Sequence, residues 1–341
     1  MRIRIIITFF TFNLLLIPIL LIAKQGFLIT PSGISYETVS KQGKGNNYET
    51  SKHYLSTSKH DLYSVDGQIL SLDSTGGKAA ILKTHLVPQK GADSEYNLYW
   101  YELVIQDTIN TSIIASFANA HILSFSPGGA CVVYSTAYPG ERLDEYKAPQ
   151  KFEKGVYIYD FTNKSAMKLD TLGVAPIDLN WSNHDGNIYI FGFDDNKVYR
   201  YNAATKKGEI VNYKGTYFTP DGKYYSNIAT ENIISKIYRT ADNSEMAGWE
   251  KDIADASGSD FTNLVFVSKK LSAFVFYFGM SSKGVTNVVF DTKQGKVIGK
   301  FEGFVRGTNP DGNLVQINPL KSDRSVDYGK IVIIDLMQFK K

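Results

Sequence analysis

Phe218-Thr219-Pro220-Asp221-Gly222-Lys223 is a short phrase that returns along this chain of 341 residues. In it an aromatic strand end leads to a proline that presets a turn, an aspartate that binds backbone amides, and a glycine that accepts a positive φ. The phrase predicts a tight turn between two strands, and its repetition predicts a repeated architecture. The other clear copies are Phe125-Ser126-Pro127-Gly128-Gly129, Thr308-Asn309-Pro310-Asp311-Gly312-Asn313 and, without proline, Trp181-Ser182-Asn183-His184-Asp185-Gly186.

The strands that follow each turn repeat as well. After the turn at residue 220, apolar runs predict strands at 224–229, 234–239 and 245–249. Degenerate copies of the phrase at 72–78 and 266–270 lead into strands in the same way. Four short antiparallel strands at a step of about 47 residues are the sequence signature of β-propeller blades. The six units have turns near residues 74, 127, 183, 220, 268 and 310.

The ends of the repeated region predict how the ring closes. Only residues 337–341 remain for a fourth strand in the last unit, and a stray strand at 61–65 precedes the first unit. If the stray strand supplies the missing edge, no open sheet edge remains. We therefore expect an all-β propeller of six blades over residues 61–341, closed by an N-terminal strand. Residues 24–60 are polar and predict a linker or surface arm, and a seventh blade hidden in them is the alternative.

Composition agrees with a β protein and narrows the partners. The 22 Tyr and 20 Phe favour half-buried pleated surfaces. The formal net charge of +3 is small for this length and both signs are mixed along the chain. We therefore expect no nucleic-acid partner. The single cysteine, Cys131, lies in an apolar run and is expected to be a buried strand residue, since it has no internal disulfide partner.

The N-terminus has the pattern of a targeting segment. Arg2 and Arg4 precede an apolar stretch from Ile5 to Ala23. A basic region followed by an apolar region is typical of an export signal, and this stretch is also long enough to span a bilayer. Residues 1–23 are therefore predicted to be a signal peptide or a membrane anchor, with residues 5–23 as the tether if they are retained. The expected location is periplasmic, secreted or membrane-tethered and facing outward.

The repeats resemble a known family. The phrases at 125–129 and 218–223 and the Tyr-x-Tyr-Asp strand at 157–160 are similar to the repeats of TolB-type β-propellers. The same repeat style occurs in the propeller domains of prolyl oligopeptidase relatives, and we expect no hydrolase domain beside this propeller. The resemblance covers residues 61–341 and implies a periplasmic or secreted propeller that binds proteins. It carries over no catalytic residue, because the repeated motif is structural.

Motifs for catalysis are missing from the sequence. The five histidines form no pair with metal-binding spacing, and neither a Gly-x-Ser-x-Gly nor a phosphate-binding loop is present. We therefore expect no catalytic residue, no metal and no cofactor, and we expect His184 to be a solvated turn residue. The alternative is a propeller enzyme, such as a lactonase-like hydrolase or a lyase, with its site at the mouth of the central channel.

Long loops between second and third strands predict a binding face. They span residues 84–97, 137–152 and 318–327, and all belong to one face of a propeller. Loops on a rigid scaffold commonly carry binding, and Tyr and Arg commonly anchor interfaces. We therefore predict a monomeric, exported, non-catalytic propeller that binds a protein or cell-envelope component. The predicted contact residues are Tyr138, Arg142, Tyr146, Lys147 and Arg324.

Overall fold

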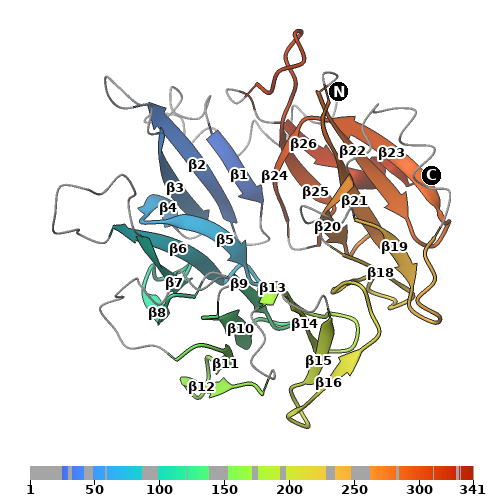
Figure 1. Cartoon of the computed structure of the whole chain (residues 1–341). Coiled ribbons are helices and arrows are strands. Elements are labelled where there is room, and N and C mark those ends of the chain that lie inside the picture. Colours follow the sequence, from blue (N-terminus) through green and yellow to red (C-terminus); the bar gives the residue numbers. More distant parts are fainter. Residues whose placement is uncertain are drawn as a thin grey trace, which may run out of the picture.

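The chain folds as a ring of antiparallel β-sheets around a central axis (Figure 1). Within the described residues the only helix is one 3-10 turn, and no helix is long and apolar enough to cross a membrane. The predicted targeting segment 1–23 lies outside these residues. The computed structural model describes residues 25–29, 33–41, 49–57, 60–86, 99–120, 122–137, 153–170, 176–192, 197–227, 235–246, 262–281, 284–309, 311–327, 330 and 332–340.

Each of the six predicted repeat units forms its own sheet, so the propeller prediction is confirmed. Strands pair in sequence order within every sheet. The first three sheets contain β5 (Gln68–Leu72), β6 (Lys78–Leu86), β7 (Tyr99–Asp107) and β8 (Ile113–Ala118); β9 (Ile122–Phe125), β10 (Cys131–Ser135), β11 (Val156–Asp160) and β12 (Ser165–Lys168); β13 (Pro176–Trp181), β14 (Ile188–Gly192), β15 (Val198–Asn202) and β16 (Lys207–Val211). The next three contain β17 (Tyr217–Phe218), β18 (Tyr224–Ser226) and β19 (Ile237–Arg239); β20 (Thr262–Ser268), β21 (Ala273–Ser281), β22 (Gly284–Asp291) and β23 (Lys296–Glu302); β24 (Phe304–Thr308), β25 (Leu314–Asn318) and β26 (Val332–Asp335).

A further sheet precedes these six and corrects the expected linker at 24–60. It contains β1 (Gln25–Ile29), β2 (Gly33–Lys41), β3 (Glu49–Thr57) and β4 (His60–Val65), paired in that order. The ring therefore holds seven sheets, as the seventh-blade alternative proposed. The physical reason is that β2 and β3, although polar on average, are rich in Ile, Tyr, Thr and Val, which favour a pleated backbone.

The predicted closure by strand exchange is wrong. The strand expected to complete the last sheet, β4, pairs with β3 instead. The sheet of β24, β25 and β26 has three strands in the described chain, and β1 lies beside its first two strands. The chain leaves β26 through the 3-10 turn η2 (Leu336–Phe339), whose start is capped because the Asp335 side chain accepts from the amide of Met337 at 3.0 Å. Leu336 is fully buried, so this segment adds apolar burial rather than a fourth strand.

The turn phrase has the predicted geometry. Gly222 and Gly312 both have φ of 65°, the left-handed region that favours glycine. The amide of Gly222 donates to the carbonyl of Thr219 at 2.8 Å, which closes the turn. Asp221 accepts from the amide of Lys223 at 3.2 Å and from the Thr219 hydroxyl at 2.7 Å. The aspartate therefore caps the turn as the sequence predicted.

The apolar core lies between successive sheets. One cluster joins Val133 and Val156 of the β9–β12 sheet to Leu179 and Ile188 of the β13–β16 sheet. Another joins Phe276 of β21 to Ile237 of β19. These clusters hold successive sheets together, and the first strand of each sheet, such as β5, β9 or β13, lies nearest the axis (Figure 1).

Candidate binding site at the mouth of the central channel

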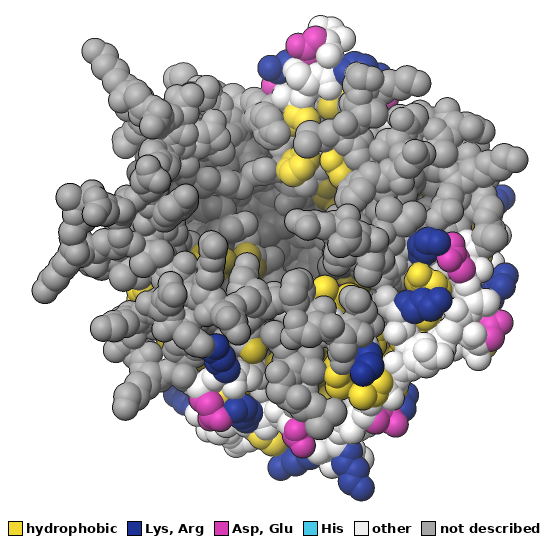
Figure 2. Space-filling model, in the orientation of Figure 1, with side chains coloured by type: hydrophobic (Ala, Val, Ile, Leu, Met, Phe, Trp, Pro, Cys, Tyr) yellow, Lys and Arg dark blue, Asp and Glu magenta, His cyan; other side chains and the backbone are white. Residues whose placement is uncertain are grey.

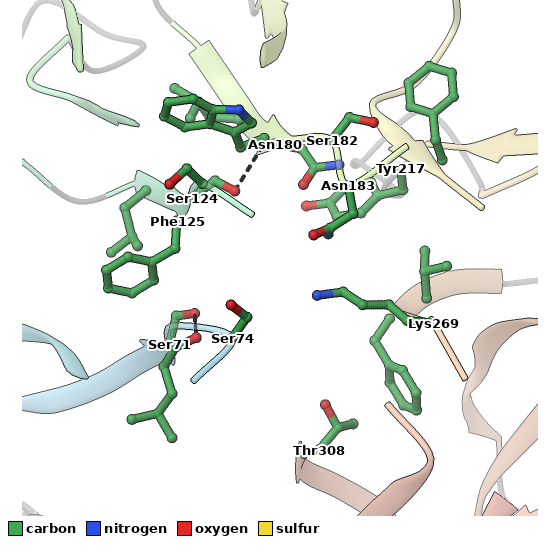
Figure 3. Close-up of a pocket in the computed structure, with 18 of the residues that line it drawn as sticks. Ser71, Ser74, Ser124, Phe125, Asn180, Ser182, Asn183, Tyr217, Lys269 and Thr308 are labelled. Carbon is green, nitrogen blue, oxygen red and sulfur yellow. Dashed lines mark hydrogen bonds between the residues drawn. The ribbon is translucent and has the colours of Figure 1, made fainter. Parts of the chain in front are cut away.

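A cavity of about 550 Å³ lies on the axis and is bordered by all six inner strands of the repeat units. Its walls are the last residues of these strands and the first residues of the turns that follow. Figure 3 shows side chains from separate blades pointing toward one central space. The cavity therefore lies at the end of the channel where the turn phrases are, opposite the loop that joins β25 and β26.

β-bulges in the inner strands shape this cavity. The pairing register shifts once in each of β5, β13, β20 and β24. The extra residues of two of these bulges, Leu70 and Val265, line the cavity. A bulge re-aims side chains relative to a regular strand. These irregularities bring apolar groups toward the axis that a regular strand would direct elsewhere.

The residue at the proline position of the turn phrase lines the cavity in four copies. These residues are Ser74, Asn183, Pro220 and Lys269. Three copies of the phrase have proline here, where it presets the turn. The copy at Ser268–Ser272 has lysine instead, and Ser272 takes the positive φ, 55°, that glycine takes elsewhere. The loss of the turn residues in this copy therefore places a cation at the channel mouth.

Lys269 is the one charged side chain among the described residues that line the cavity. Its amino group extends from the end of β20 into the central space (Figure 3). It forms no hydrogen bond or ion pair with a described residue. Nearby protein atoms remove part of the hydration of the ammonium and lower its pKa, and the negative charge of Asp311 partly opposes this shift. The side chain is nevertheless accessible to solvent from within the channel.

Hydroxyl and amide groups surround Lys269, and they fall into two sets. Ser124 accepts from the backbone amide of Trp181 at 2.9 Å, and the Asn180 amide donates to the Thr216 carbonyl at 2.7 Å. These two side chains tie neighbouring blades together. The second set makes no side-chain hydrogen bond with a described residue and is available to a ligand: Ser74, Asn183 and Thr308.

A buried carboxyl group lies just behind the cavity wall. Asp178 accepts from the Tyr217 hydroxyl at 2.7 Å, from the amide of Leu179 at 2.9 Å and from the Thr216 hydroxyl. Burial raises the pKa of Asp178, and burial beside Asp178 raises the pKa of Tyr217 further above its ordinary value. Its partners lie in the inner strands β13 and β17 or directly before β17. Asp178 is therefore a link between two blades rather than a group that reaches the channel.

Of the five predicted loop residues, the structure describes Arg324, which does not line this cavity. Arg324 lies in the loop between β25 and β26, with φ of 66°, and donates to the Glu302 carboxylate at 2.9 Å. Because β25 runs away from the turn end, this loop lies at the opposite end of the ring. The other four predicted contacts lie outside the described residues: Tyr138, Arg142, Tyr146 and Lys147.

One partly buried cluster combines serine, glutamate and histidine but has no triad geometry. His85 stacks on Trp100 with ring centroids 4.0 Å apart and contacts the Glu102 carboxylate at 2.9 Å. Ser116 donates to the same carboxylate and not to His85. A nucleophilic serine needs the histidine as its base, so this cluster stabilises the outer surface of β6, β7 and β8.

The cavity offers binding groups rather than an acid–base pair. Its described lining consists of hydroxyls, amides, apolar and aromatic side chains and one ammonium, without a carboxylate or imidazole. Within the part of the chain that the structure describes, no group of three or more His, Cys, Asp and Glu residues gathers as metal ligands would. Cys131 lies in β10, and burial, followed by the charge of Asp160, raises the pKa of its thiol. Sequence reasoning did not select Lys269 as a site residue, because its copy of the turn phrase is degenerate. The lysine in place of the repeated proline could have indicated it.

These features define a β-propeller with a polar pocket at one end of its channel. No family model matches the chain, and no curated protein matches its sequence. Its structural neighbours include the β-propeller domain of the Trilobed protease from Pyrococcus furiosus, at 12% identity and a TM-score of 0.55 over 91% of this chain and 93% of that one. U3-55K is 11% identical, with a TM-score of 0.52 over 92% of this chain and 96% of the U3-55K chain. TolB from Acinetobacter baumannii is 13% identical, with a TM-score of 0.44 over 71% of this chain. The match spans 57% of the TolB chain. The likeness to the Trilobed protease domain and to U3-55K shows the propeller fold and nothing beyond it.

Proposed function

We propose that this chain is an exported, non-catalytic propeller that binds a protein or cell-envelope partner. The observation that supports it best is the pocket at the channel mouth. There an ammonium, hydroxyl and amide groups that have no side-chain partner among the described residues lie beside aromatic side chains. Pockets with a few directed polar groups on an apolar lining are typical of ligand sites. A site for acid–base chemistry would instead need a proton donor or acceptor at the axis.

The long loops at the other end of the ring form a second proposed contact region. It contains Tyr138, Arg142, Tyr146 and Lys147, together with Arg324. The last of these is exposed and held by Glu302, so its guanidinium is presented from an ordered turn. A rigid blade under a variable loop is the usual arrangement of a binding propeller.

Surface charge supports a protein partner over a nucleic acid. Figure 2 shows Lys and Arg side chains interspersed with Asp and Glu around the periphery of one face. The small net charge of +3 agrees with this mixture. A protein of small net charge attracts a polyanion weakly.

Export is proposed from the N-terminal pattern of Arg2, Arg4 and the apolar stretch 5–23. A fusion of residues 1–60 to an alkaline phosphatase reporter tests it in a bacterial host, because the enzyme gains activity only outside the cytoplasm. Active reporter supports export. Activity no higher than that of a fusion lacking residues 1–23 contradicts it.

Partner binding is tested by capture on the immobilised chain from an envelope extract. The wild type is compared with a variant that lacks residues 138–152 and with a Lys269→Met variant. A protein retained by the wild type and lost from either variant supports the proposal. Retention of no protein, together with turnover of a lactone by the purified chain, would favour the enzyme alternative.

A further inference from the structure

We propose that the channel mouth binds a carboxylate carried on an apolar peptide segment of the partner, and that Lys269 is the cation that selects it. This inference rests on the proposed function and names the chemistry of the segment that is bound. It assigns recognition to the turn end of the ring, whereas the sequence predicted it at the loop end.

The first support is the position of Lys269 within the repeat. The equivalent residue in three copies is proline, a neutral turn former, and in the other two it is Ser74 or Asn183. A lysine stabilises such a turn less well than proline. It also brings a positive charge into a space that other blades line with neutral groups. Lys269 therefore makes this turn less stable than proline would. Binding of an anion at the channel mouth would explain why a lysine occupies the position.

The second support is the electrostatic state of that ammonium. It has lost part of its hydration in the channel and has no ion-pair partner among the described residues. Asp311 acts on it through space without forming an ion pair, while the backbone carbonyl of Asp311 accepts from the amide of Lys270 at 3.1 Å. An anion placed at the axis would restore the lost interaction of the charged amine.

The third support is the match to a single negative charge. The described lining of the cavity has one cation, and Ser74, Asn183 and Thr308 offer hydroxyl and amide donors for the remaining lone pairs of a carboxylate. A doubly charged phosphate is usually held by an arginine fork or by several cations. The described lining has neither, so a carboxylate fits it better.

The apolar walls indicate what carries the carboxylate. Phe125, Phe218 and Phe266 line the cavity, and Val265 is 37% exposed there. These side chains favour an aliphatic or aromatic neighbour beside the charge. The volume of about 550 Å³ lies within the range of ordinary ligand pockets, roughly 300–1,000 Å³. A short stretch of peptide fits this space better than a lone small anion.

The test uses the purified chain on an array of short peptides. Pairs differ only by Asp against Asn, or Glu against Gln, between apolar residues. Every peptide is made with a C-terminal acid and with a C-terminal amide, which separates an acidic side chain from a chain terminus as the source of the carboxylate. Wild type, Lys269→Met and Lys270→Met are compared. Lys270 is the matched control, because it is the adjacent lysine and does not line the cavity.

We expect the wild type and Lys270→Met to bind the carboxylate peptides about tenfold or more tightly than their neutral partners. Lys269→Met should lose this preference while melting at the same temperature as Lys270→Met. Equal binding of acidic and neutral peptides by the wild type, or an unchanged preference in Lys269→Met, overturns the inference. If the envelope partner is captured equally by wild type and Lys269→Met, the inference fails while the proposed function stands. If the acidic preference appears but no envelope protein is captured, only the proposed function fails.

Discussion

A β-carbon added to Gly222 would lie 2.0 Å from Nε2 of His184, so the turn of one blade packs directly on the turn of the blade before it. The same kind of contact recurs at two other turns. The added carbon would lie 2.3 Å from the Asp73 carboxylate at Gly129 and 2.9 Å from the Ser268 backbone at Gly312. The glycine of the phrase therefore has two roles. It closes its own turn, and its lack of a β-carbon leaves room for the turn of the neighbouring blade to pack against it. This explains why the turns hold the channel mouth in shape.

Gly222→Ala should destabilise the fold more than Gly186→Ala. Both residues have positive φ, which costs an alanine roughly 1–2 kcal/mol. A β-carbon on Gly186 has no atom within 4 Å, whereas one on Gly222 meets the imidazole of His184. Urea denaturation measures the difference. The double variant His184→Ala, Gly222→Ala should return to the stability loss of Gly186→Ala, and equal losses in the two single variants would show that the turns do not press on each other.

Asp178→Asn should change how stability depends on pH. The pKa of Asp178 is raised in the folded chain by burial, so the folded state holds a proton that the unfolded state releases above about pH 4. Its contribution to stability is therefore present at low pH and falls as pH rises toward the folded pKa. The asparagine variant should lose this decline and become relatively more stable toward neutral pH. Denaturation curves measured across this range provide the check.

Asp160 provides the matched control with the opposite sign. The amides of Asn163 and Thr162 hold the pKa of this exposed carboxylate below its usual value. Its contribution is therefore present above the unfolded pKa and lost as pH falls. Asp160→Asn should lower stability at neutral pH and match the wild type in acid. The same slope for both variants would rule out the assignment for Asp178.

Leu336→Ala should cost about 2–5 kcal/mol, because the side chain is fully buried in the core of the last two sheets. Ile333→Ala, at a position 45% exposed on β26, should cost much less, about 0.5 kcal/mol. Thermal and chemical denaturation compare the two. Similar costs would mean that the 3-10 turn after β26 adds little to the last blade.

Arg324→Asn should leave the stability of the fold within about 1 kcal/mol of the wild type. The variant loses an exposed ion pair with Glu302, worth roughly 0–1 kcal/mol, and gains a residue that tolerates the φ of 66°. If this variant no longer captures the partner, the loss would indicate that Arg324 contacts the partner. Glu302→Gln removes the same ion pair and keeps the guanidinium, so it should still capture the partner. Unfolding of Arg324→Asn would instead assign the residue a structural role.

The turns and most blades could be predicted because their chemistry is local. Thr219, Asp221 and Gly222 bond within a few residues of one another, so the phrase itself contains the whole turn. The sheet at residues 25–65 was predicted only as the alternative to a linker. Its composition is polar on average, and average polarity conceals the strand-forming residues of β2 and β3.

The closure of the ring and the channel site are not local. Whether residues 61–65 join the last blade depends on the competition between β3 and β26, which are far apart in the sequence. In the sequence, Lys269 is visible only as a departure from the repeated proline. Its approach to Ser74, Asn183 and Thr308 required six inner strands to meet around one axis.

The sequence by itself therefore determined the repeat, the turns and the propeller class, since neighbouring residues decide backbone conformation. Only the tertiary structure decided how many sheets share the ring, how the ring closes and which side chains face the channel. Those properties depend on packing between blades, and no stretch of sequence contains both sides of such a contact.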